Sequence, residues 1–289
     1  MLFAAGFAAR RLNLLGPKQA GGMLELVLNV GLPALFISNI SRLHLGMEVA
    51  VLPVAAVIII VALLAAAVAT GRQLGLQRAE QGALALCVMC INNAFQFTFV
   101  LPAWGGEGFA YLALFDFGHT LMQGTLIYVV AAAYGSHSAG AAVIARKVLA
   151  FPLLWALVAA LVINVSGYVL PRPVALVLDT GGRLVLLLVV VALGVLFDAR
   201  LVRSRGVVAA LLLRTGLGFA LGWMLAALFG LTGMARAALL LGAAGPIGFS
   251  SVVLASREGL SRDLSASAAS ISVLLGFVYV PLELWLLAP

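Results

Sequence analysis

The chain of 289 residues is 64% hydrophobic and only 9% charged, with a mean hydropathy of +1.18. A soluble globular protein of this length could not cover its surface with so few polar groups, so the composition predicts an all-α protein that crosses a membrane several times. The net charge of +7 does not indicate a nucleic-acid partner, because the basic residues stand in short connections between apolar runs.

Apolar runs of about 20 residues predict ten transmembrane spans. They cover residues 1–12, 20–41, 48–70, 80–103, 109–134, 148–169, 175–197, 206–229, 234–256 and 264–287. The first span is short, because the nine residues before Arg10 reach only about 14 Å as a helix.

Lysine and arginine are divided unevenly between the connections. The odd-numbered connections carry 12 of the 17 basic residues, whereas the even-numbered ones carry three. Short cytoplasmic loops are enriched in Lys and Arg, so we expect the odd connections in the cytoplasm and both termini outside.

The fifth connection is rich in Gly, Ala and Ser and divides the chain into two halves. We expect residues 1–135 to form a first repeat of five spans, residues 136–147 a short cytoplasmic linker, and residues 148–289 a second repeat of five spans. An odd number of spans in each half inverts the second half relative to the first, as in many secondary transporters.

Span nine is interrupted in the middle of its apolar run by Gly245, Pro246 and Gly248. Proline inside a helix costs about 3 kcal/mol, so this span is expected to consist of two half-helices. In hydrocarbon such a break survives only where the freed backbone groups are buried in protein or face a water-filled cavity. Transporters build substrate sites from broken spans. The alternative is a kinked helix whose small residues allow close packing.

Span four carries two adjacent amides, Asn92 and Asn93, in an otherwise apolar run. Burying an amide without a hydrogen bond costs about 1–3 kcal/mol. The pair either joins helices by hydrogen bonds or lines a polar site where spans four and nine cross. A shift of the sequence by 155 residues places Asn92 on Ile247, beside the break in span nine, which favours the second interpretation.

The sequence resembles the auxin efflux carrier family, which includes bacterial malonate-type transporters and plant PIN proteins and is more distantly similar to bile acid:sodium symporters. The segments that carry the resemblance are Leu28–Ser41, the Asn93 region, Trp104–Asp116 and Ala243–Gly259. The resemblance covers essentially the whole chain. Family members often have a Gly-x-Pro step after the span-four asparagine, which is absent here, so we expect a less sharp break in span four than in span nine.

The resemblance implies ten spans in two inverted five-span repeats. Spans one, two, six and seven would form a scaffold, and the other six would form a transport domain in which broken spans four and nine cross. It further implies a homodimer in the inner membrane of a bacterium.

A crossing of two broken helices directs two helix N-termini to one place, and such ends favour anions. We therefore expect neutral donors there to bind a carboxylate such as malonate or an auxin-like acid. The candidate substrate-binding residues are Asn92, Asn93, Gln96, Gly245, Pro246, Ile247, Gly248, Ser250 and Ser251. The half-helix C-termini, near Ile91 and Ala244, would suit a cation, but no Asp or Glu lies beside either break, which argues against a tight sodium site.

Three further polar residues lie within predicted spans. Asp116 and His119 share one face of span five, which indicates either a proton-coupling pair or a structural hydrogen bond. Arg214 lies within span eight. It either extends to the cytoplasmic headgroups, the interpretation that we favour, or faces the cavity and attracts an anion.

These features predict a secondary transporter for a small organic anion. The chain lacks the sequence signs of a metal cluster, a nucleophile triad, a phosphate loop or paired carboxylates, so we expect neither an enzyme nor a cofactor or metal. Protons are the expected coupling ion, ahead of sodium. The alternative is a membrane sensor or scaffold that binds an organic anion without transporting it.

Overall fold

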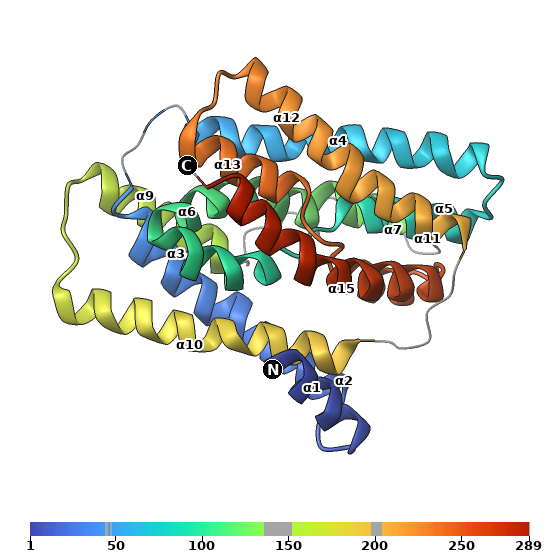
Figure 1. Ribbon diagram of the computed structural model, residues 1–289, viewed down its shortest axis with the longest axis horizontal. Helices are drawn as coiled ribbons and strands as arrows, with labels where there is room; N and C mark the ends of the chain where they lie inside the picture. Colours follow the sequence, from blue (N-terminus) through green and yellow to red (C-terminus); the bar gives the residue numbers. More distant parts are fainter. Residues whose placement is uncertain (44–45, 47, 136–151, 198–203, 289) are drawn as a thin grey trace.

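The computed structural model describes residues 1–43, 46, 48–135, 152–197 and 204–288. Among these residues all regular elements are helices, and most of them lie roughly along the long axis of the molecule (Figure 1). A helix pairs its backbone polar groups internally, which is what a chain in hydrocarbon requires. The expected all-α class is therefore confirmed, while the linker predicted at residues 136–147 lies outside the described residues.

The first half contains α1 (Leu2–Arg11), α2 (Pro17–Leu26), η1 (Val27–Gly31), α3 (Leu32–Ile40), α4 (Glu48–Gln73), α5 (Arg78–Met89), α6 (Asn93–Met122), η2 (Gln123–Ile127) and α7 (Tyr128–Tyr134). The second half contains α9 (Pro152–Val165), α10 (Arg172–Leu196), α11 (Arg205–Leu211), η3 (Leu212–Leu217), α12 (Gly218–Leu228), α13 (Gly233–Ala243), α14 (Ser250–Arg257) and α15 (Arg262–Leu286). Each η segment is a π-helical turn that joins its neighbours into one continuous helix.

The described helices include long apolar ones. Five are long and apolar enough to cross a membrane: Pro17–Ile40, Ala50–Gln73, Arg172–Leu196, Arg205–Leu228 and Arg262–Leu286. The other predicted spans correspond to shorter or interrupted helices. The boundary between spans four and five falls at Gly105 inside α6, where a φ of 66° kinks the helix. Glycine adopts this conformation without strain, so the kink occurs where the sequence places a Gly-Gly pair.

Helix α1 is short, as predicted, and α10 holds it in place. Gly6 of α1 and Gly194 of α10 let the two backbones touch, because neither has a side chain to separate them. The Arg10 guanidinium then donates to the carbonyl oxygens of Val195 (3.0 Å) and Phe197 (2.5 Å), at the end of α10. These contacts stabilise α1, because a helix of ten residues is too short to be stable on its own.

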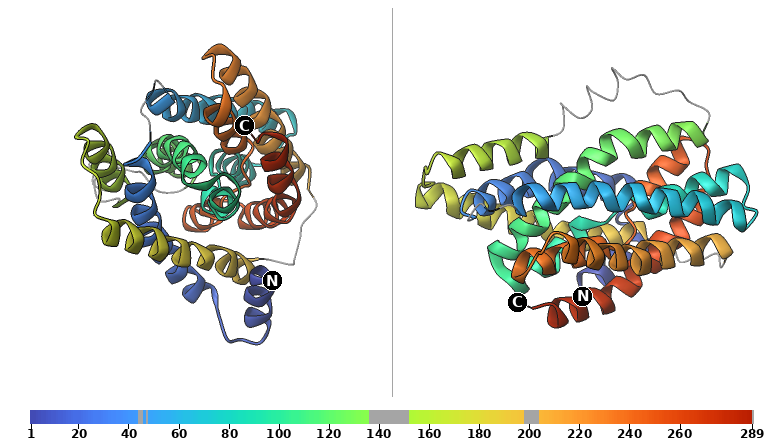
Figure 2. Two further views of the ribbon diagram at one scale, coloured as in Figure 1. Left: turned by 60° about the vertical axis from the view of Figure 1, so that its left-hand side comes forward. Right: turned by 90° about the horizontal axis from the view of Figure 1, so that it is seen from above.

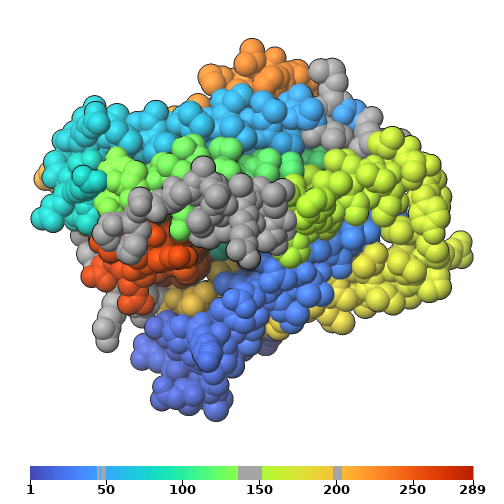
Figure 3. Space-filling view, turned by 180° about the vertical axis from the view of Figure 1, so that it is seen from behind, coloured from blue at the N-terminus to red at the C-terminus, as the bar shows by residue number. Residues whose placement is uncertain are grey.

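The helices pack in two groups. The first comprises α1, α2, α3, α9 and α10, and on the back face α2 and α3 run diagonally toward α9 (Figure 3). The second comprises α4 to α7 and α11 to α15 (Figure 2). Helix α6 joins them, since the Phe36 ring of α3 packs edge-on against Phe97 and Phe109 of α6.

Two glycines bring α12 close to the end of α13. A Cβ on Gly222 would lie 2.6 Å from the Ala243 Cβ, and one on Gly218 would meet the Ala243 carbonyl oxygen. Glycines four residues apart let two membrane helices pack with their backbones in contact. The end of α13 is thereby held against the helix that carries Arg214.

We predict that Gly222→Ala lowers the free energy of unfolding by about 1–3 kcal/mol, because the added methyl overpacks the contact with Ala243. Gly216→Ala is the control, because no described residue lies within 4 Å of an added Cβ at this position of the same span, and it should leave the stability unchanged or slightly raised. Thermal unfolding of the purified variants in detergent measures both. Equal melting temperatures for the two variants would contradict the close contact.

Candidate functional site

The chain is broken twice in the second group of helices, and the two breaks lie against each other. The first break, residues 90–92, separates α5 from α6, and the second, residues 244–249, separates α13 from α14. Ile91 and Ile247 form an antiparallel bridge between them. Its hydrogen bonds run from Asn92 N–H to the Pro246 oxygen (2.8 Å) and from Gly248 N–H to the Cys90 oxygen (2.9 Å). The two broken spans lie in contact, as predicted, and the first break is shorter than the second.

Glycine and proline in the second break permit this close approach. Pro246 has no N–H, so it contributes only its carbonyl group to the bridge. A Cβ on Gly248 would lie 2.8 Å from the Ile91 carbonyl oxygen, and one on Gly245 would lie 2.6 Å from the Ile91 side chain. Side chains at these two positions would therefore force the two breaks apart.

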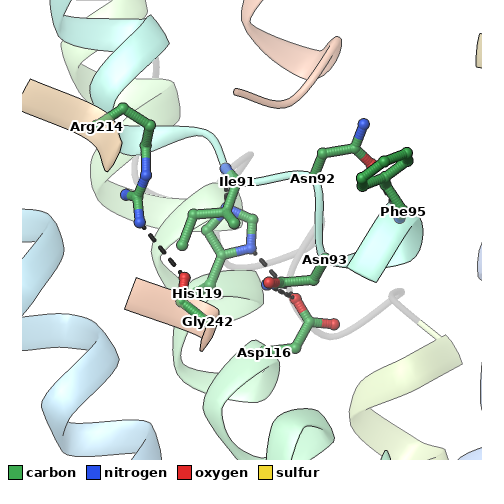
Figure 4. Close-up of polar contacts among 8 residues, drawn as sticks. All are labelled: Ile91, Asn92, Asn93, Phe95, Asp116, His119, Arg214 and Gly242. Atoms are coloured by element: carbon green, nitrogen blue, oxygen red, sulfur yellow. Dashed lines mark hydrogen bonds and ion pairs between the residues drawn. The ribbon is translucent and has the colours of Figure 1, made fainter. Parts of the chain in front are cut away.

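The first turn of α6 leaves hydrogen-bond donors free. The Asn92 Oδ1 caps the helix by accepting from Phe95 N–H (3.2 Å). Its Nδ2 is buried and has no hydrogen-bond partner among the described residues. The N–H groups of Asn93 and Ala94 belong to the first turn, so they have no acceptor within the helix. This end of α6 thus presents donors with partial positive charge, beside the Phe95 ring (Figure 4).

Asn93, Asp116 and His119 form a buried network that joins α6 to the first break (Figure 4). Asn93 Nδ2 donates to Asp116 Oδ1 (2.5 Å), and the same oxygen lies 3.3 Å from His119 Nδ1. On the other side of the ring, Ile91 N–H donates to His119 Nε2 (3.1 Å). The predicted proximity of Asp116 and His119 is confirmed. Their link to the break through Ile91 is a further finding.

The other candidate donors are engaged in holding the crossing together. Gln96 Nε2 donates to the Leu241 oxygen (2.5 Å), which leaves its Oε1 without a partner among the described residues. Ile247 N–H donates to Ser272 Oγ (2.9 Å), and Ser251 Oγ–H donates to the Gly248 oxygen (2.7 Å). Ser250 is half-buried at the first residue of α14. The structure brings the predicted residues together, and Asn92 Nδ2 is the buried side-chain donor among them that has no partner within the described part of the chain.

Arg214 does not extend to the headgroups, so the favoured interpretation of this residue is wrong. Its side chain is fully buried in η3. The guanidinium donates to carbonyl oxygens at the ends of α5 and α13, namely those of Val88 (3.0 Å), Gly242 (3.4 Å) and Ala243, and to that of Gly245 (3.2 Å). Helix C-termini leave carbonyl groups unpaired and carry partial negative charge, so they attract a cation. The Arg214 guanidinium therefore binds these helix ends and not the lipid headgroups.

The sequence contains a signal for this contact. Arg214, Gly218 and Gly222 recur at intervals of four residues, which places the arginine on the face where the glycines admit a neighbouring helix. An arginine on a small-residue face points into the helix bundle and away from lipid.

We predict that neutral His119 carries its proton on Nδ1. The Nε2 atom accepts from Ile91 N–H and cannot hold a proton in this geometry, whereas Nδ1 faces the Asp116 carboxylate. Nitrogen-15 NMR of histidine-labelled protein distinguishes the tautomers, and His119→Gln identifies the signal among the three histidines of the chain. A proton on Nε2 would contradict the contact with Ile91.

Comparison with known proteins agrees with the resemblance found in the sequence. Residues 1–134 match the family described as "Membrane transport protein". A protein of Methanothermobacter thermautotrophicus described as "Uncharacterized transporter" is 26% identical over 295 residues, which cover 98% of this chain and 94% of that protein. With its long apolar helices, the chain fits a multi-pass membrane protein, and its first half is similar to a family of membrane transport proteins.

Proposed function

We propose that the protein is a secondary transporter that moves a small organic anion, a carboxylate such as malonate or an auxin-like acid, across the cytoplasmic membrane of a bacterium. The observation that carries this proposal is Asn92 Nδ2, which has no hydrogen-bond partner among the described residues and lies at the buried N-terminus of α6, within the crossing of two broken helices. A helix N-terminus in a low-dielectric surrounding binds anions, and a donor without a partner there needs a ligand.

The donors suit a substrate that has to leave again. Asn92 Nδ2 and the N–H groups of Asn93 and Ala94 carry partial charges only, so they would hold a carboxylate without a full ion pair. The apolar part of the acid would pack on the aromatic rings of Phe95, Phe99 and Phe277, whose centroids lie 4.9 to 6.0 Å apart. Such a surface accepts either a short aliphatic or an aromatic acid.

Transport in this proposal is by alternating access in a fold of two inverted five-span repeats. The second group of helices, which contains the crossing, moves against the first group, which acts as a scaffold and dimerises with a second copy. Helix α6 is the element on which this motion acts, since it begins at the crossing and contacts α3 through Phe97 and Phe109. Asn93 and Asp116 join its two parts across the kink at Gly105.

The network around His119 couples transport to protons in this proposal. A proton added to Nε2 would remove the acceptor of the Ile91 N–H and leave a buried donor unpaired at the first break. Protonation of the His119 ring would therefore destabilise the arrangement of the crossing seen in this structure. A proton bound on one side of the membrane would favour the conformation in which the crossing is rearranged.

We predict saturable uptake of labelled malonate or of an aromatic carboxylate into proteoliposomes, and its loss in Asn93→Ala. Asn92→Ser keeps a cap oxygen for α6 but removes the free Nδ2, so it should weaken substrate binding about 10-fold to 100-fold, the effect of one hydrogen bond to a charged group. Its melting temperature should stay close to that of the native protein, whereas Asn92→Ala also loses the cap, worth about 1 kcal/mol. Unchanged uptake in Asn92→Ser would contradict the site, and binding without flux would favour the sensor.

We also predict that a pH gradient drives this uptake and that Asp116→Asn abolishes its response to the gradient, because the network then loses its charged member. Asp179→Asn is the matched control. Asp179 pairs with Arg183 on the surface of α10 (2.8 Å), away from the crossing, and its loss should leave the response unchanged. Native uptake that is independent of the gradient would exclude the proton-coupling role.

A further inference from the structure

The C-terminal ends of α5 and α13 meet on the side of the crossing opposite to the free donors. Each helix C-terminus carries roughly half a negative charge, so the two ends together are equivalent to about one negative charge. The Arg214 guanidinium, with one positive charge, lies between them and is fully buried. Among the described residues it forms no ion pair with a carboxylate. The two helix ends are therefore the counter-charge of this arginine.

The groups around the guanidinium form a shell of carbonyl oxygens. Val88 supplies the oxygen from α5, and the remaining three come from the end of α13 and the residues that follow it. Tyr279 of α15 donates its hydroxyl to the next oxygen, that of Ala244 (3.1 Å), and so extends the cap. Shells of backbone carbonyl oxygens also bind free inorganic cations in proteins. Here a side chain of the protein occupies the position.

We propose that Arg214 is a built-in cation that holds the two half-helix C-termini together and takes the place of a free inorganic cation at the crossing. The guanidinium is tethered to η3, so it cannot dissociate during the transport cycle, and transport requires neither sodium nor potassium. This consequence for transport rests on the proposed function, whereas the structural role of the arginine does not.

Removal of the arginine side chain should leave the shell of carbonyl oxygens as an empty cation-binding site. In Arg214→Ala the shell faces a space that has the shape of a guanidinium group. Free guanidinium has the same charge and the same planar set of donors, so it should bind there and restore the contact between the two helix ends. Sodium and potassium lack that planar shape and should restore less.

The test compares thermal unfolding of purified Arg214→Ala in chloride salts of guanidinium, sodium, potassium and choline. The salts are used at about 10 mM, where the denaturing effect of guanidinium is negligible. We expect the variant to melt below the native protein and guanidinium to raise its melting temperature. The native protein and Arg183→Ala, which loses an exposed arginine, should show no such rise. A variant that melts like the native protein, or one that guanidinium does not stabilise, would overturn the proposal.

A second pair of variants covers the case in which Arg214→Ala does not fold. Arg214→Lys keeps the charge with a different shape, and Arg214→Gln keeps hydrogen-bond donors without the charge. If the charge between the helix ends is what matters, the lysine variant melts above the glutamine variant. Equal melting temperatures, or the reverse order, would overturn the proposal.

Transport provides a separate measurement. Native uptake should be the same in sodium, potassium and choline buffers, and a requirement for sodium would show that a free cation is needed despite Arg214. The melting experiments need no substrate. Stabilisation by guanidinium in a protein that transports neither acid would therefore support the role of Arg214 and contradict only the proposed function.

Discussion

A membrane protein has to pair every backbone polar group that is out of reach of water, and the crossing follows from this constraint. Each broken span frees N–H and C=O groups in the interior of the bundle. The bridge between Ile91 and Ile247 pairs part of them across the two breaks. Carbonyl groups at the end of α13 accept hydrogen bonds from the side chains of Arg214, Gln96 and Tyr279, which belong to three other helices. Both breaks are stable because each provides partners for the other.

The two sides of the crossing differ in what they leave unpaired. The guanidinium of Arg214 occupies the side of the helix C-termini, whereas on the side of the α6 N-terminus Asn92 Nδ2 has no partner among the described residues. The buried network of Asn93, Asp116 and His119 lies next to this free end, so a change of charge in the network acts on the same backbone that would hold the substrate.

Much of this arrangement follows from local features of the sequence. Apolar runs predicted the long helices, Pro246 predicted the break in α13–α14, and the spacing of Asp116 and His119 predicted their contact. The partners of Arg214 could not be predicted in this way, because Val88 lies 126 positions away from it and hydropathy alone favours a path to the headgroups. The sequence also does not reveal which atom of a buried side-chain amide lacks a hydrogen-bond partner. That depends on the hydrogen bond which the other atom makes, as the cap on Phe95 N–H shows for Asn92.

Main-chain atoms make the hydrogen bonds between the two breaks. Their strength depends little on which side chains the bridged residues carry, provided that Gly245 and Gly248 keep the approach open. The crossing can therefore persist while neighbouring residues such as Phe95 or Ser250 change during evolution. A fold built in this way can diversify its ligands among relatives without redesigning the framework, in the manner of an antibody domain that varies its loops on a constant sandwich.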